Sequence, residues 1–385
     1  MTSFSVQELL PDYIKRFEAY IPSKPDPELM KLYGCSRLYR LNNNENPLGP
    51  PPAAQEVLRN WPTVQAAKYP SGDAYYLRQA LGARFGKDAD RFLVGNGANE
   101  VISFVIKAFC ESGDNIVTAD RTFAVYEWIA QFSGFEARLV PLRDYAFDDQ
   151  GMLERMDART KIVFICNPNN PTGTYWNRDK LCSFLDAVAG KRVVVADEAY
   201  CEFVESEDYP DSMTLMDEYP NLIVFRTFSK MYGLAGLRIG YLAGDSEVVD
   251  AVRRTCVVYS VNTMAQEAAL AALGDDEHIF RTRQMVREGK EFLRKELNRL
   301  GLPFIADEGN FVMIRLPMSD TLAYRKLMTH GVMVRAMTGF RCPNHIRVTV
   351  STMDAMDAFV EAMEKTLASE TSNKRRAGAV AVENR

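Results

Sequence analysis

Seven short apolar runs dominate the chain between about residues 90 and 245. They are DRFLVG, DNIVTA, EARLVPL, TKIVFIC, RVVVAD, NLIVFRT and LRIGYLA. Runs this rich in β-branched residues are typical of strands that are buried on both faces of a sheet. Helical patterns lie between them, as in NEVISFVIKAFCESG, where apolar residues recur at helical spacing until Gly113. Strands that alternate with helices predict an α/β fold with a mostly parallel sheet, flanked by helices on both faces.

The pattern changes after about residue 275. A long charged helix, RTRQMVREGKEFLRKELNRLG, is followed by GNFVMIRL, a further helix, GVMVRAM, HIRVTVS and a closing helix. This order predicts a second, smaller α+β domain. We expect an N-terminal segment at 1–60 that packs on the small domain, a large domain at 61–275, the small domain at 276–368, and a disordered tail at 369–385, where large apolar residues are few.

Composition disfavours several classes of protein. The formal net charge is −5 with scattered Lys and Arg, which gives no electrostatic reason to expect nucleic acid or a membrane surface as a partner. The N-terminal sequence mixes acids and bases, and no apolar run approaches the roughly 20 residues that span a bilayer. We therefore expect a cytoplasmic protein. The seven cysteines form no CxxC pair and there are three histidines, so we expect neither a disulfide framework nor a metal site.

Polar groups follow four of the predicted strands. Lys230 comes after NLIVFRT, Asp197 ends RVVVAD, Asn170 follows TKIVFIC, and GNGAN at 95–99 begins as DRFLVG ends. Ligands in open α/β sheets bind beyond the carboxyl ends of the strands. The four groups therefore predict one binding site at one edge of the sheet.

Asp197 places a carboxylate at the end of a buried strand. Such a group is costly unless it meets a positive partner. The protonated ring nitrogen of pyridoxal 5′-phosphate (PLP) is one such partner, and a carboxylate there keeps the ring an electron sink. The alternatives are a helix N-cap and a structural salt bridge.

Lys230 lies in the glycine-rich segment TFSKMYGLAGLRIG. A lysine that forms a covalent bond with a carbonyl group needs a site that lowers its pKa. The hydroxyls of Thr227 and Ser229 could hold phosphate oxygens, and Arg238 could pair with a phosphate through two hydrogen bonds. A surface lysine in a flexible loop is the alternative.

The GNGAN turn opens a helix, so the backbone N–H groups around Gly97, Ala98 and Asn99 could also bind phosphate. Glu100 stands where a dinucleotide fingerprint needs a third small residue, which disfavours an NAD-dependent dehydrogenase.

Three further residues are candidates for holding the PLP ring. Asn170, in the tight turn NPNNPTG, could donate a hydrogen bond to the phenolic oxygen, and Tyr200 could donate to the same atom. Phe123 could stack on the ring, with packing in the core as its alternative.

In their order and spacing, these motifs resemble the histidinol-phosphate aminotransferase family of fold-type I PLP enzymes. The similar strings are LNNNENPLGP, KYPSGDAYYLRQAL, GNGANE, CNPNNPTG, DEAYCEF, RTFSKMYGLAGLRIGY, YSVNTMAQEAA and HIRVTVST. They extend from about Phe17 to Leu367. Two positions depart from the family pattern: Ser351 stands where glycine is usual, and Ala98-Asn99 where Ser-Asp is frequent.

The resemblance implies a role for each matched residue. Lys230 would bond PLP, Asp197 would face its ring nitrogen, Asn170 and Tyr200 would hold its phenolic oxygen, and Phe123 would stack on it. The residues implied to bind or flank the cofactor phosphate are Gly97, Ala98, Asn99, Thr227, Ser229, Arg238 and, from the opposite subunit of a homodimer with shared active sites, Tyr69. Those implied to bind the substrate are Asn44, Glu45, Arg335 near its phosphate and Arg347 at its carboxylate.

The implied reaction is transamination between histidinol phosphate and 2-oxoglutarate, giving imidazole-acetol phosphate and glutamate in histidine biosynthesis. An aromatic amino-acid aminotransferase is the main alternative, and a phosphothreonine-type decarboxylase is a weaker one. From another class, a non-catalytic PLP-binding regulatory domain would be joined to a basic DNA-binding module.

Overall fold

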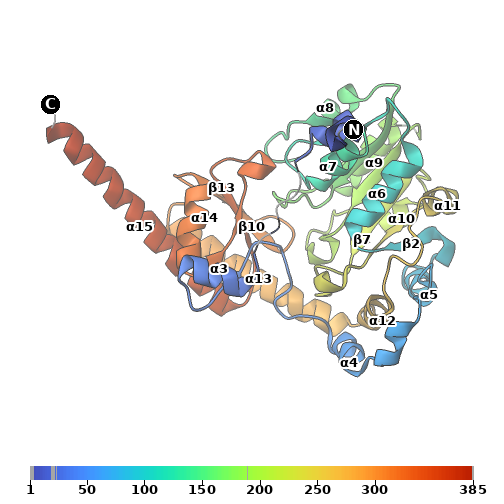
Figure 1. Cartoon of the computed structure of the whole chain (residues 1–385), viewed down its shortest axis with the longest axis horizontal. Coiled ribbons are helices and arrows are strands. Elements are labelled where there is room, and N and C mark those ends of the chain that lie inside the picture. The colour runs from blue at the N-terminus through green and yellow to red at the C-terminus, as the bar shows by residue number, and fades with distance from the viewer. Residues whose placement is uncertain (1–3, 19–21, 23, 189, 384–385) are drawn as a thin grey trace. The chain divides into compact units, whose positions relative to one another are not determined.

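The computed structural model describes residues 4–18, 22, 24–188 and 190–383 (Figure 1). The chain divides into two compact units. Unit 1 comprises Met1–Ile21 and Leu48–Phe280, and unit 2 comprises Pro22–Pro47 and Arg281–Arg385.

Unit 1 is built on one sheet, which has seven strands in the described part of the chain, in the order β2-β8-β7-β6-β5-β3-β4. β8 runs antiparallel to both of its neighbours, and the other neighbouring pairs are parallel. Each of the seven predicted runs forms one strand, and the mostly parallel α/β fold is confirmed. The strands are β2 (Phe92–Gly95), β3 (Asn115–Ala119), β4 (Glu136–Val140), β5 (Thr160–Cys166), β6 (Val193–Asp197), β7 (Leu222–Thr227) and β8 (Gly240–Ala243).

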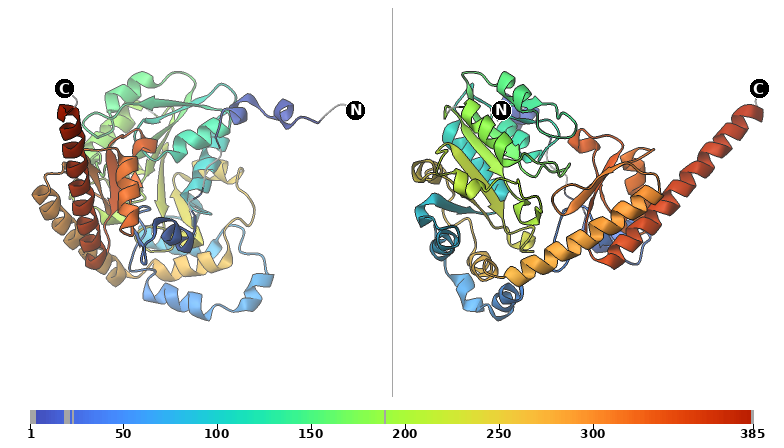
Figure 2. Two further views of the ribbon diagram at one scale, coloured as in Figure 1. Left: turned by 60° about the vertical axis from the view of Figure 1, so that its left-hand side comes forward. Right: turned by 180° about the vertical axis from the view of Figure 1, so that it is seen from behind.

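Helices lie on both faces of this sheet (Figures 1 and 2), as a parallel sheet requires. Local sequence explains several of their ends: the side chain of Asp245 accepts the N–H of Glu247 at 2.9 Å, and that of Asn262 accepts the N–H of Ala265 at 2.8 Å. The α-helices are α1 (Val6–Leu9), α2 (Asp12–Lys15), α4 (Pro52–Asn60), α5 (Tyr75–Phe85), α6 (Ala98–Phe109), α7 (Val125–Phe132), α8 (Asp149–Arg155), α9 (Arg178–Val188), α10 (Ser212–Leu215), α11 (Ser246–Arg253) and α12 (Thr263–Ala272). Short 3-10 helices occupy η1 (Thr63–Ala67), η2 (Ala89–Arg91), η3 (Cys201–Phe203) and η4 (Ala235–Leu237).

The middle strands form the core of unit 1. Every residue of β3 and β8 is buried, as are nearly all those of β5, β6 and β7. Because β2, β3, β5, β6 and β7 point the same way, the loops that follow them emerge at one edge of the sheet. These are the loops that contain the predicted cofactor residues.

Unit 2 contains a sheet that has four antiparallel strands among the described residues, in the order β12-β13-β10-β9, and a parallel pair of β1 with β11. The segment Pro22–Pro47, which lies between the two parts of unit 1 in the sequence, joins unit 2 through backbone hydrogen bonds, since the N–H of Thr349 donates to the carbonyl of Leu41 at 2.9 Å. The elements are α3 (Asp26–Tyr33), β1 (Tyr39–Arg40), α13 (Asp276–Arg299), β9 (Phe304–Ile305), β10 (Phe311–Arg315), α14 (Asp320–Thr329), β11 (Val332–Met333), β12 (Arg335–Ala336), η5 (Thr338–Phe340), β13 (His345–Thr349) and α15 (Met353–Glu383). The first residues of α13, up to Phe280, belong to unit 1.

The division differs from the predicted domains at the N-terminus. Residues 22–47 do belong to unit 2, but 48–60 belong to unit 1, where α4 packs on α12. The described residues 4–18 also belong to unit 1, because the ring of Phe17 meets that of Phe132 edge to face at 5.6 Å. These contacts join residues far apart in sequence, which a pattern of local apolar runs does not reveal.

The C-terminal region forms one helix, α15, which continues to Glu383. Residues 384 and 385 of the predicted tail lie outside the described residues, and a disordered tail stays a prediction. No helix in the described part of the chain is both long and apolar enough to cross a membrane.

Candidate active site

The predicted cofactor residues of unit 1 follow neighbouring strands. Asp197, the last residue of β6, is in register with Cys166 at the end of β5 and with Phe225 of β7. The N–H of Asn167, which opens the loop of Asn170, donates to the carbonyl of Asp197 at 2.9 Å. Lys230 lies three residues beyond the end of β7. The structure therefore places the loops of Asn170 and Lys230 on either side of the strand end that bears Asp197.

The carboxylate of Asp197 lies in a closed environment, with 3% of the residue exposed. The hydroxyl of Tyr126 donates to its Oδ2 at 2.5 Å, and the N–H of Ala199 donates to its Oδ1 at 3.2 Å. Among the described residues no cation pairs with it, so the salt-bridge alternative does not apply. Burial raises the pKa of Asp197, with the two hydrogen bonds acting against this. A buried acceptor of this kind fits a positively charged ring nitrogen.

Tyr126 is a site residue that the sequence did not suggest. Its ring stacks on Phe164 at 4.7 Å and meets Phe123 edge to face at 5.5 Å. Burial and the neighbouring Asp197 raise the pKa of Tyr126 well above its usual range, so the hydroxyl stays a donor. In the sequence, the only indication of a role for Tyr126 was its position three residues after Phe123.

The loop after β5 separates the roles of two adjacent asparagines. The hydroxyl of Thr122 donates to Asn169 Oδ1 at 2.8 Å, and Asn169 Nδ2 donates to Thr172 Oγ1 at 2.9 Å. Asn169 therefore holds the loops after β3 and β5 together. Asn170 is buried beside it, and Tyr200 is buried at the start of η3. Their contacts with the phenolic oxygen of PLP stay predictions.

A cradle for an anion forms where β2 turns into α6. Gly97 has φ +80°, a backbone conformation that favours glycine, and a Cβ on it would displace the guanidinium of Arg238. α6 begins at Ala98, and no side chain caps it. An uncapped helix N-terminus beside an arginine fits a phosphate group.

Thr227 and Ser229 lie next to each other at the end of β7. Both are buried, and the N–H of Ser229 donates to Thr227 Oγ1 at 3.0 Å. Asn99, in contrast, is exposed on the first turn of α6. The structure thus brings Arg238 against Gly97 at the start of α6, and it places Thr227 and Ser229 at and just beyond the end of β7, before Lys230.

In unit 2 the two predicted substrate arginines face each other. Arg335 of β12 and Arg347 of β13 are directly opposite in register. Arg347 is 4% exposed and donates from Nη2 to the carbonyl of Asn42 at 2.7 Å, while the guanidinium of Arg335 lies 5.4 Å from the ring centre of Phe340. No carboxylate of the described residues pairs with Arg335. Like charges in opposite positions are destabilising, so an anion on this face would relieve the repulsion.

Asn44 and Glu45 belong to the same unit. Asn44 has φ +55° and is buried, and its Oδ1 accepts from the hydroxyl of Thr349 at 3.2 Å. Glu45 lies 3.8 Å from Nε of Arg40. Asn44 is therefore held by Thr349 of β13, which lies two residues beyond Arg347. Glu45 has a partner in Arg40.

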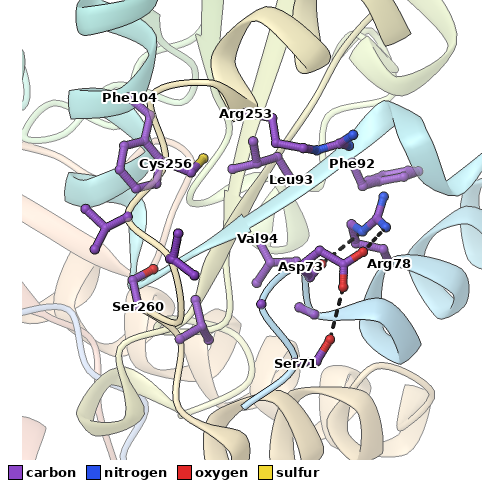
Figure 3. Close-up of a pocket in the computed structure, with 15 residues that line it drawn as sticks. Ser71, Asp73, Arg78, Phe92, Leu93, Val94, Phe104, Arg253, Cys256 and Ser260 are labelled. Carbon is purple, nitrogen blue, oxygen red and sulfur yellow. Dashed lines mark hydrogen bonds and ion pairs between the residues drawn. The ribbon is translucent and has the colours of Figure 1, made fainter. Parts of the chain in front are cut away.

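Tyr69 is largely exposed, at 83%, and its ring stacks on Tyr259 at 4.9 Å. A Cβ added to Gly72 would lie 3.4 Å from the ring of Tyr259, and Gly72 helps to line a cavity of about 170 Å³ (Figure 3). Inside this cavity Asp73 pairs with Arg78 and accepts from the hydroxyl of Ser71 at 3.0 Å. The lining contains no predicted site residue. A side chain this exposed is accessible to a second copy of the chain.

Comparison with known proteins gives a match over most of the chain. The family described as "Aminotransferase class I and II" matches residues 36–363. The chain is 38% identical over 356 residues to the histidinol-phosphate aminotransferase of Moorella thermoacetica, covering 92% of each protein. It is 40% identical over 354 residues to that of Symbiobacterium thermophilum, covering 92% of this chain and 97% of the relative.

Solved structures are similar as well. The histidinol-phosphate aminotransferase of Sinorhizobium meliloti, solved in complex with pyridoxal-5′-phosphate, superposes with a TM-score of 0.85 and 25% identity. The similarity covers 96% of this chain and 99% of that one.

Proposed function

The chain belongs to the class I and II aminotransferase family, and on that premise we propose that it is a PLP-dependent enzyme that transfers an amino group from histidinol phosphate to 2-oxoglutarate. The products would be imidazole-acetol phosphate and glutamate. The observation that carries the proposal is the carboxylate of Asp197, which is buried, held by Tyr126 and without a cation among the described residues. A buried carboxylate without a positive partner destabilises the folded protein, and a positively charged ligand would remove that cost.

PLP, when bound, supplies the electron sink for the pair left on the substrate Cα. Asp197 would hold the proton on the ring nitrogen, while Asn170 and Tyr200 would donate to the phenolic oxygen and Phe123 would stack on the ring. The helix N-terminus at Gly97, Ala98 and Asn99, the hydroxyls of Thr227 and Ser229, and the guanidinium of Arg238 would bind the phosphate.

Lys230 would bond the cofactor between turnovers. Once the substrate amine has displaced it, its Nζ would take the proton from the substrate Cα as general base and, as general acid, would deliver it to C4′ of the bound cofactor. Its position three residues beyond β7 supports this role, because the strand end holds the backbone while the long side chain can move.

The two arginines of unit 2 support a substrate that is a phosphate in one half-reaction and a dicarboxylate in the other. Histidinol phosphate lacks an α-carboxylate, whereas glutamate has one. Guanidinium groups match both carboxylate and phosphate geometry. We therefore assign Arg347 to the substrate carboxylate and Arg335 to the substrate phosphate, with Asn44 and Glu45 as further substrate residues.

We also propose a homodimer with shared active sites, in which Tyr69 reaches the cofactor phosphate of the other subunit. Its exposure supports this, as do nearby exposed apolar residues such as Val257 and Val258. None of the seven cysteines forms a disulfide, which fits a reducing compartment, so we place the enzyme in the cytoplasm.

The test of the substrate proposal is a half-reaction screen of the PLP-loaded enzyme with histidinol phosphate, phenylalanine, tyrosine and phosphothreonine. Histidinol phosphate should react best, and Arg335→Ala should cost about 2–3 kcal/mol in kcat/KM with it. The same variant should change the glutamate half-reaction much less, whereas Arg347→Ala should damage both. Arg315→Ala, on an exposed side chain of the same sheet, is the control. A preference for phenylalanine or tyrosine would make the enzyme an aromatic aminotransferase.

A further inference from the structure

A second buried carboxylate follows Asp197 directly. Glu198 is 0% exposed, and Nε and Nη2 of Arg226 on β7 donate to its Oε2 at 3.0 and 2.8 Å. The N–H of Glu198 donates to the carbonyl of Phe225 at 2.9 Å, which continues the β6–β7 ladder by one step. The two adjacent carboxylates thus have separate partners, Tyr126 for one and Arg226 for the other.

The ion pair is itself enclosed. The side chain of Arg226 is 13% exposed, and its guanidinium lies 5.2 Å from the ring centre of Phe85. Burial raises the pKa of Glu198, and the charge of Arg226 acts against this shift. Buried ion pairs of this kind are often no more stabilising than apolar residues of the same volume. Stability alone therefore does not account for the pair.

Its place in the fold suggests what it does. Glu198 is next to Asp197, and Arg226 is next to Thr227, the last residue before the loop of Lys230. The pair therefore ties together the two strand ends that bear the proposed ring-nitrogen partner and the proposed cofactor lysine. The pair thus adds a side-chain link to the backbone hydrogen bonds between β6 and β7.

We propose that Glu198 and Arg226 are positioning residues, which fix the separation between the Asp197 carboxylate and the Lys230 amine and so allow both to engage one PLP molecule. The inference rests on the proposed function. Neither side chain touches the cofactor in this account. They act through Asp197 and Lys230.

The test replaces the pair by apolar residues of similar volume, E198L together with R226M. Two quantities are measured on the purified protein: the equilibrium dissociation constant for PLP, and the fraction of chains labelled on Lys230 after borohydride reduction at saturating PLP. Thermal unfolding of the apoprotein reports stability. We expect an apoprotein that unfolds close to wild type but binds PLP at least about tenfold more weakly, with a reduced labelled fraction.

A matched control uses an ion pair at the start of β2, away from the carboxyl ends of the strands. Arg91 pairs with Asp217 in unit 1, and R91M with D217L should leave both PLP readouts unchanged. If E198L/R226M does not fold, the same PLP measurements on Arg226→Lys test the positioning role instead. This variant keeps the charge but loses the second hydrogen bond, and PLP affinity a few-fold weaker than wild type is expected.

Wild-type affinity and full labelling in E198L/R226M, or in Arg226→Lys if the double variant is unfolded, would overturn the positioning role. A different outcome identifies failure of the proposed function: wild-type protein that forms no lysine-bound cofactor at all.

Discussion

Asp197 carries an ionisable group where water does not reach it. Burial raises the pKa of Asp197, so the folded apoprotein holds the proton of this carboxyl group more tightly than the unfolded chain does. The contribution of this group to stability is therefore largest at low pH and falls as the pH rises through the raised pKa. At neutral pH the apoprotein bears a cost that a positively charged ligand would remove.

Asp197→Asn should therefore separate stability from activity. Transamination should fall at least ~10³-fold, or about 4 kcal/mol, because the amide cannot hold the ring nitrogen protonated. The apoprotein should become more stable at neutral pH by about 1–3 kcal/mol, since a buried charge is lost. Activity assays and denaturant unfolding without PLP measure the two effects.

The control for this variant is Asp186→Asn, which alters a hydrogen bond from Tyr219 at the surface and should change neither quantity. A mild loss of activity in Asp197→Asn would instead point to a purely structural role for Asp197.

The sequence reveals residues that follow strand ends more readily than the residues that contact them in the fold. Asp197 and Lys230 follow apolar runs whose ends can be located locally. The partner of Asp197 could not be found in this way, because Tyr126 lies 71 positions earlier in the chain. The Glu198–Arg226 pair, 28 positions apart, was missed for the same reason.

Among the elements, α6 begins at a backbone geometry that restricts which residue can stand there. Gly97 combines a positive φ with a guanidinium that occupies the place of a side chain. In the proposed function both features would allow the backbone N–H groups and Arg238 to share one anion.

Gly97→Ala should weaken PLP binding by at least about tenfold, because the methyl group would displace Arg238 and strain the turn. Titration of the apoprotein with PLP measures the effect. Gly236→Ala, in the same loop as Arg238 and with nothing within 4 Å of an added Cβ, is the matched control. Equal affinities in the two variants would show that Gly97 does not help to bind the phosphate.

The strands could be predicted because each is a short buried run bounded by turn residues. The reversed direction of β8 could not, since a buried strand has the same composition in either direction. Likewise, the place of residues 41–44 in unit 2 depends on hydrogen bonds to Thr349, which lies 305 positions beyond Asn44.

At the scale of the whole molecule, unit 1 contains the proposed cofactor residues and unit 2 the proposed substrate arginines. In the proposed homodimer the exposed Tyr69 of a second copy completes the site, with two-fold symmetry as the usual arrangement. Each active site would then depend on a neighbouring chain as well.

Complementation tests the shared site. Chains with Tyr69→Ala and chains with Lys230→Ala should each be nearly inactive. A heterodimer of the two contains one site with both wild-type residues, so mixing under exchange conditions should restore activity. Native mass spectrometry would verify that heterodimers form. Heterodimers without activity would argue against a shared site.

The most direct measurement of the central proposal is the identity of the lysine that bonds PLP. Wild-type protein is loaded with PLP, reduced with borohydride and digested, and the labelled peptide is identified by mass spectrometry. The account predicts a single phosphopyridoxyl group on Lys230, and no label at this peptide in Lys230→Ala, which should also lose turnover. A label on another lysine, or none in the wild type, would contradict it.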